Sequence, residues 1–158
     1  MAAPVLRWAC LAFPQLDAGT LYALMRQRQE VFIVEQCCAY LDADGADPDC
    51  AHLLGRDAGG QLQASLRIVP PGLKYDEASI GRVVTSPSLR GSGLGIELMT
   101  QGVRHCERLH PARGIRISAQ AHLQRFYRRF DFEPVGEPYL EDNIPHIEML
   151  RPASVGTR

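Results

Sequence analysis

The pattern of apolar and polar residues in the first half of the chain predicts two kinds of element. Val5 to Phe13 is a mostly apolar run that ends at Pro14, which is typical of a strand. Asp17 can then cap a helix, and the apolar residues that follow recur at helical spacing towards Gln36. The helical positions are Leu21, Leu24, Met25 and Phe32. Three further runs predict strands at 51–56, 62–69 and 78–85, the first two joined across the hairpin signal Gly59-Gly60.

The second half continues this alternation. A helix with one apolar face follows a glycine-rich segment and closes at Pro111. Later patterns predict a strand at 115–119, helical residues at 122–130, and strands at 132–139 and 144–150. The order strand, loop, helix, strand requires a parallel crossover, which is almost always right-handed. We therefore predict an α/β fold with a mixed sheet covered by helices.

Composition favours one domain that works in a reducing environment. The 158 residues are 46% hydrophobic, which suits a single core, and we place one domain at 1–151 with a flexible tail at 152–158. A net charge of -1 argues against nucleic acid as a partner. Five cysteines without a C-x-x-C pair fit free thiols rather than disulfides or zinc. With no export signal and no long apolar run, we expect a cytoplasmic protein that makes no membrane contact, either a monomer or a homodimer.

The segment Arg90-Gly91-Ser92-Gly93-Leu94-Gly95 carries the chemistry that is easiest to interpret. Glycines between a strand and a helix let a ligand approach the backbone, and the free N–H groups of the first helical turn attract phosphate. A Walker P-loop is excluded, because no lysine follows Gly95. A dinucleotide site fits poorly, because Ile96 stands where glycine or alanine is needed. The pattern R/Q-x-x-G-x-G/A of acetyl-CoA binding remains, beside the alternative of a purely structural turn.

A second cluster one strand later carries a family resemblance. The segment from Ala121 to Phe132 is similar to the second signature of the GNAT acyltransferase superfamily, a helix that carries Phe-Tyr. The likeness to the ElaA-like branch extends over nearly the whole chain, through the stretches 31–36, 42–45, 80–84, 119–124 and 144–147. The resemblance implies a GNAT-type, centrally splayed mixed sheet. Asp131 and Asn143 replace the usual glycines and Ala39 replaces a proline. Asp and Asn tolerate left-handed backbone, so we expect the turns to survive.

The resemblance also implies a mechanism. A substrate amine would attack the thioester of acetyl-CoA directly, in a cleft where two parallel strands part, with no metal. Tyr127 would protonate the departing thiolate; the alternative is a tyrosine that only packs on the cofactor. The cofactor-binding residues implied are Val83, Val84, Thr85, Arg90, Gly91, Ser92, Gly93, Leu94, Gly95, Gln120, Phe126 and Tyr127.

No single general base follows from the sequence. Ser79 stands where some relatives carry a glutamate, so other groups must be considered. The candidates are Glu35, Glu141, His52, His122 and His146, each with the alternative of a surface carboxylate or a core histidine. The aspartates of the loop 42–49 do not follow the spacing of a calcium loop. They could attract a cationic amine or simply form turns. Cys37 and Cys38 lack an activating partner in the sequence.

Three functions remain open. The first is an N-acetyltransferase that acts on a small-molecule or protein amine. The second is a protein of the same fold that binds CoA without turnover, suggested by the missing strand glutamate. The third is an acyl-homoserine-lactone synthase, although its N-terminal aromatic and arginine pattern is not evident here. The sequence does not identify the acceptor or the acyl-chain preference.

Overall fold

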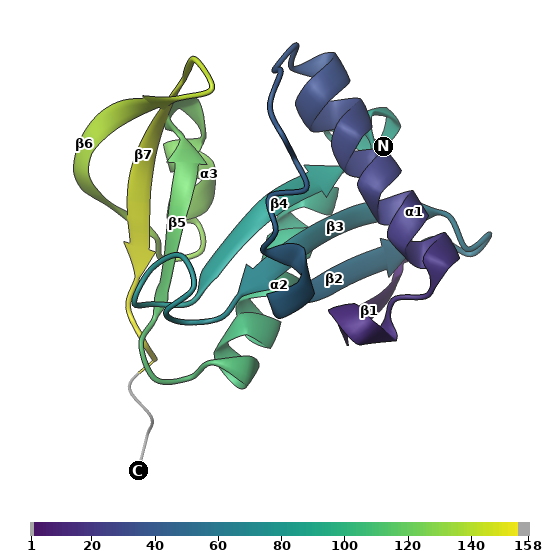
Figure 1. Cartoon of the computed structure of the whole chain (residues 1–158), viewed down its shortest axis with the longest axis horizontal. Coiled ribbons are helices and arrows are strands. Elements are labelled where there is room, and N and C mark those ends of the chain that lie inside the picture. The colour runs from purple at the N-terminus through teal and green to yellow at the C-terminus, as the bar shows by residue number, and fades with distance from the viewer. Residues whose placement is uncertain (1, 155–158) are drawn as a thin grey trace.

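A computed structural model describes residues 2–154 as alternating strands and helices (Figure 1). The strands are β1 (Arg7–Ala12), β2 (Ala51–Arg56), β3 (Leu62–Val69), β4 (Ser79–Thr85), β5 (Ile115–Gln120), β6 (Glu133–Glu141) and β7 (Ile144–Arg151). The helices are α1 (Ala18–Arg28), α2 (Leu94–Leu109) and α3 (Gln124–Arg128). Shorter helical pieces are η1 (Phe13–Gln15), η2 (Gln29–Glu35), η3 (Asp47–Asp49), η4 (Pro87–Leu89) and η5 (Ala121–Leu123). Within residues 2–154 every helix is too short or too polar to span a membrane.

The elements expected from the sequence are present with small shifts at their ends. Asp17 caps α1 as expected, since its carboxylate accepts a hydrogen bond from the backbone N–H of Thr20 at 2.7 Å. Such a cap is worth about 1 kcal/mol to a helix. The helical pattern towards Gln36 is divided, because α1 widens into the π-helical segment η2. In the proposed tail, 152–154 follow β7, and 155–158 lie outside the described residues.

The strands form two antiparallel sheets that meet at one end only. One has the order β1-β2-β3-β4 and the other β5-β7-β6. Strands β4 and β5 are parallel neighbours, joined by a single bridge between Ala78 and Ile115, where the N–H of Arg116 donates to the carbonyl of Ala78 at 2.9 Å. Figure 1 shows the two strands diverging beyond this point. The single-domain α/β fold with a mixed, centrally splayed sheet is confirmed.

The core lies between the four-stranded sheet and α2, while α1 covers the opposite face (Figure 1). Leu98, Met99 and Cys106 of α2 are fully buried there. Gly102 permits this close packing, because a Cβ at that position would lie 2.6 Å from Cδ2 of Leu66. Burial of α2 thus holds its N-terminal turn firmly beside the end of β4.

Candidate active site

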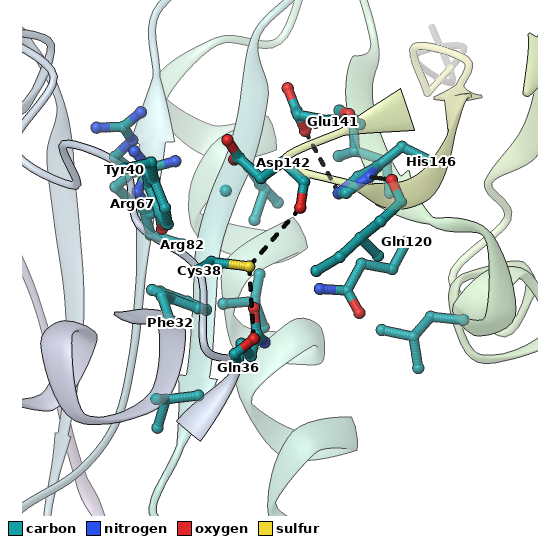
Figure 2. A pocket seen from close by; sticks show the side chains of 18 of the residues that line it. Phe32, Gln36, Cys38, Tyr40, Arg67, Arg82, Gln120, Glu141, Asp142 and His146 are labelled. Atoms are coloured by element: carbon teal, nitrogen blue, oxygen red, sulfur yellow. Dashed lines mark hydrogen bonds and ion pairs between the residues drawn. The ribbon is translucent and has the colours of Figure 1, made fainter. Parts of the chain in front are cut away.

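A cavity of about 930 Å³ occupies the space where β4 and β5 diverge. One wall comes from η2, the loop after it, β3 and β4, and the other from β5, β7 and the turn between β6 and β7. Figure 2 shows Arg67 and Arg82 on one wall, facing Glu141 and His146 on the other, with Cys38 between them. The two halves of the sheet therefore supply different side chains to one space.

A β-bulge interrupts β4 beside this cavity. The pairing of β4 with β3 slips at this point, and Arg82 has a φ of 52°, which is uncommon for a residue other than glycine. Val83 and Thr85 line the cavity, whereas the side chain of Val84 is buried in the core. Since β4 meets β5 only at its start, its free edge presents backbone groups to the cavity.

The glycine loop lies at the beginning of α2. Gly91 and Gly93 have φ values of 80° and 90°, and Gly93 is the N-cap residue of α2. No atom lies within 4 Å of where a Cβ would stand on either residue, so the backbone faces open space. A Cβ on Gly95 would lie 3.8 Å from the Phe126 ring. The loop therefore has the left-handed conformation and the exposed first-turn amides that suit an anion.

A second cavity of about 450 Å³ adjoins this loop. Its lining combines the three glycines with residues of η5 and α3, including Arg125, and with Arg129, which directly follows α3. His122 lines both cavities, so the two spaces are adjacent. Two guanidinium groups beside exposed amides make the second cavity suitable for phosphate groups.

The remaining loop residues have different surroundings. The side chain of Leu94 is 1% exposed and belongs to the core, so only its backbone can reach a ligand. The Ser92 hydroxyl donates to the carbonyl of Leu89. Arg90 lines the main cavity and pairs with Glu35, with 2.6 Å between Nη2 and Oε1. Glu35 is therefore at the cavity, but its carboxylate already has a cationic partner.

Tyr127 reaches the main cavity from α3 although it is only 9% exposed. The Phe126 and Phe132 rings pack against it edge to face, at centroid distances of 5.1 Å and 6.2 Å. Burial raises the pKa of the Tyr127 hydroxyl to about 12. The hydroxyl therefore keeps its proton at neutral pH, which is the form that a proton donor needs, while the raised pKa makes it a weaker acid than a free phenol. Gln120, at the end of β5, lines the same cavity.

Glu141 and His146 face each other across a contact that has room for one proton. Nδ1 of His146 lies 2.6 Å from the carbonyl of Ile144, which can only accept, so Nδ1 carries the hydrogen. Nε2 lies 3.3 Å from Oε2 of Glu141 (Figure 2). A neutral imidazole and an ionised carboxylate would both be acceptors at this contact. The pair thus gains a hydrogen bond when it takes up a proton.

Two hydroxyl groups extend this pair. Ser118 of β5 hydrogen-bonds to the Tyr139 hydroxyl and donates to Oε2 of Glu141 at 3.3 Å. The Tyr139 ring stacks on His146 with a centroid distance of 6.1 Å. These contacts hold Glu141 and His146 against β5, beside the cavity.

His52 lies elsewhere. It is buried in β2, and its Nε2 donates to the carbonyl of Asp47 at 3.0 Å. Burial lowers the pKa of its imidazole. It does not line either of the two cavities described above, so the structure does not bring it together with the other candidate bases.

The aspartates of the loop after η2 belong to a network of ion pairs. Three arginines face three aspartates, with N–O distances from 2.7 to 3.4 Å: Arg28, Arg67, Arg82, Asp42, Asp44 and Asp47. Hydrogen bonding from Arg67 holds the pKa of Asp44 well below its usual range. Because each aspartate is already paired with an arginine, these aspartates have no free negative charge to attract a cationic amine. They stabilise the loop instead.

Comparison with known proteins identifies the family. The model of the acetyltransferase (GNAT) domain matches residues 62–151, more than half of the chain. The chain belongs to the GNAT acetyltransferase family. The crystal structure of an acyl-CoA N-acyltransferase from Pseudomonas aeruginosa is 46% identical, with a TM-score of 0.88, covering 93% of this chain and 99% of that one. Protein ElaA of Escherichia coli is 42% identical over 149 residues, 93% of this chain and 97% of ElaA, and its crystal structure gives a TM-score of 0.87.

More distant solved structures share the fold alone. The acyl-homoserine lactone synthase BjaI is 16% identical with a TM-score of 0.73, covering 94% of this chain and 84% of that one. At this identity the likeness gives no support to synthase activity. The resemblance to the ElaA-like branch, in contrast, is confirmed over almost the whole length of the chain.

The departures from the usual GNAT pattern are accommodated as the sequence indicates. Asp131 and Asn143 adopt φ values of 64° and 60°, the left-handed conformation expected of a glycine substitute. Ala39 is exposed in the loop after η2. Beside it, Sγ of Cys38 lies 3.8 Å from the carbonyl of Asp142, across the cavity. This loop therefore approaches the turn between β6 and β7 in the GNAT fold.

Some site residues of this GNAT chain escaped the sequence analysis. Ser118 alternates with Gln120 along β5, and this period of two could have placed both on the cavity face. Tyr139 gives no such signal, because it reaches Ser118 only through the pairing of β6 with β7 and of β7 with β5. Arg125 and Arg129 follow each other at helical spacing, which could have indicated a shared face beside the glycine loop.

Proposed function

We propose that the protein transfers an acetyl group from acetyl-CoA to a primary amine by direct attack. The observation that carries this proposal is the continuity of the site. The main cavity extends from Arg90 past Tyr127 to the Glu141–His146 pair, and it shares His122 with the second cavity, which the glycines line. The name of the Pseudomonas relative, an acyl-CoA N-acyltransferase, supports the same class of reaction.

The glycine loop fits the diphosphate of the cofactor. Open space above Gly91 and Gly93 leaves room for phosphate oxygens to reach the amides of the first turn of α2. Arg125 and Arg129 would add charge-assisted hydrogen bonds to phosphate. The free edge of β4 from Val83 to Thr85, together with Gln120, would accept and donate hydrogen bonds along the pantetheine arm.

Deprotonation of the amine is the harder chemical demand. An amine of pKa about 10.4 must lose its proton near pH 7, which costs about 4.6 kcal/mol. The Glu141–His146 pair can take that proton, because its Nε2 to Oε2 contact becomes a hydrogen bond only when a proton is present. We therefore assign this pair as the general base, with Ser118 and Tyr139 as positioning residues.

The transfer then balances as follows. The neutral amine forms the new C–N bond and its nitrogen then releases a second proton to solvent, the C–S bond breaks, and the thiolate takes a proton from the Tyr127 hydroxyl, which recovers one from solvent. A backbone N–H at the bulge of β4 would stabilise the negative charge that develops on the thioester oxygen. Glu35 pairs with Arg90, and His52 is outside the cavity, so neither is part of this mechanism.

Thiol release from acetyl-CoA over a panel of amines tests the proposal. We expect release that depends on both the amine and the enzyme, together with an acetylated product in the mass spectrum. The alternative is a non-catalytic protein that binds CoA as a structural or sensing ligand. A CoA-induced rise in melting temperature without release for any amine would support that alternative and contradict the proposal.

A further inference from the structure

The charges that line the main cavity are mostly paired, and the exceptions are informative. Glu35 pairs with Arg90, and the arginines of the network pair with its aspartates. While His146 is neutral, three charged groups of the lining have no ion-pair partner within 4 Å among the described residues: Lys74, Glu141 and Asp142. They are one cation and two neighbouring anions in the same cavity.

Lys74 provides the cation. It is the sole lysine of the chain, and it lies in the loop between β3 and β4. Desolvation of its ammonium lowers its pKa, even though the residue as a whole is exposed. Arg82 also borders this space, and its hydrogen bonds use Nε and Nη2, which leaves Nη1 available. Two N–H donor groups with positive charge are therefore open to a ligand.

The anionic side lies at the turn between β6 and β7. Asp142 follows Glu141 directly, and Figure 2 shows both on the wall opposite Arg67 and Arg82. The proton-sharing pair of Glu141 and His146 is on this side. An amine that is to lose its proton must therefore come to this wall, which leaves Lys74 and Nη1 of Arg82, in the same cavity, for another part of the same molecule.

We propose that the acceptor is a small primary amine that also carries a carboxylate, as an amino acid does. The ammonium would lie against Glu141 and Asp142, and the carboxylate would accept hydrogen bonds from Lys74 and from Nη1 of Arg82. A carboxylate balances the charge of Lys74, and the ammonium faces the carboxylates of Asp142 and of Glu141, whose pair with His146 then takes the proton. This inference rests on the proposed acetyltransferase function and specifies its substrate class.

Matched pairs of amines test the inference. Each pair consists of an amino acid and the amine that lacks only its carboxylate, such as phenylalanine with phenethylamine and tyrosine with tyramine. At pH 8 the amino acid of each pair is expected to have a kcat/KM at least about tenfold higher, the scale of one charge-assisted hydrogen bond. The variant Lys74→Met should remove this preference by raising KM for the amino acid while leaving KM for the amine unchanged.

Two control variants distinguish a specific effect of the Lys74 charge from a general effect of removing a positive charge. Lys74→Arg keeps the charge and should retain most of the preference, and Arg7→Ala removes an exposed charge on β1 and should retain all of it. Equal kcat/KM within each pair would overturn the inference and leave the acetyltransferase proposal intact. No transfer to any amine would overturn both. A mass increase of one acetyl group on Lys74 itself would show that this lysine is an acceptor rather than an anchor, and would also overturn the inference.

Discussion

At the scale of single residues, the assignment of roles depends on counting donors and acceptors. His146 has one ring nitrogen committed to a carbonyl and the other beside a carboxylate, whereas Glu35 is already paired with Arg90. The sequence placed all of these residues among the candidate bases but could not rank them. Ranking needs the contacts across β5, β6 and β7, which join residues far apart in the chain.

The variant His146→Gln tests the base. We expect kcat for a good amine acceptor to fall about 100-fold at pH 7, within the range of general base catalysis. The difference in kcat should become smaller as the pH approaches the pKa of the amine, because the free amine then needs no base. A pH profile from 6.5 to 10 for both proteins gives the measurement, and isothermal titration with CoA checks that cofactor affinity is unchanged.

His110→Gln is the matched control, because His110 lies at the end of α2, outside both cavities. Its profile should follow that of the wild type. A His146→Gln enzyme with wild-type kcat at pH 7, or with a deficit that stays constant up to pH 10, would contradict the assignment of this pair as the base.

At the scale of elements, the strands and helices were largely predictable and their irregularities were not. Periodicity located β2, β3, α2 and β7 to within a residue or two, since each buries one face or is buried whole. The bulge at Arg82 and the π-helical turn of η2 had no signal in the sequence. Each irregularity has beside it an arginine that pairs with Asp42: Arg28 directly precedes η2, and Arg82 lies in the bulge. Such long-range pairs cannot be inferred from local pattern.

The burial of His52 within β2 gives a prediction about stability. Because burial lowers the pKa of His52 below its unfolded value of about 6.5, the unfolded chain binds a proton in this range that the folded chain does not. Stability should therefore fall as the pH drops below about 6.5, by at most about 1.4 kcal/mol per pH unit from this group. Urea unfolding at pH 7.5 and 5.5, followed by Trp8 fluorescence, measures it.

In His52→Gln this loss should be smaller than in the wild type, since glutamine does not titrate and its amide can still donate to the carbonyl of Asp47. His122→Gln, at an exposed position on η5, should lose as much stability as the wild type. If all three proteins lose the same free energy of unfolding between the two pH values, His52 does not titrate as burial implies.

At the scale of the whole molecule, the split between two sheets places the chemistry. The sequence order of strand, glycine loop, helix and strand indicated a parallel crossover, and the family resemblance added that the two strands part. What the sequence could not provide is the distribution of charge across the cavity. The network around Arg67 neutralises the acidic loop, and so the unpaired charges are Lys74, Glu141 and Asp142 rather than the cluster of aspartates.

The measurement that tests the account most directly is calorimetric titration of CoA into three proteins. Gly93→Val should weaken binding at least about 100-fold, since a side chain at this positive φ distorts the first turn of α2 and covers its amides. Gly60→Val is matched to it, with a φ of 82° and open space around its Cβ in the turn between β2 and β3. We expect the wild type and Gly60→Val to bind CoA with similar affinity. Folded wild-type protein that does not bind CoA, or Gly93→Val that binds as tightly as Gly60→Val, would contradict the central claim.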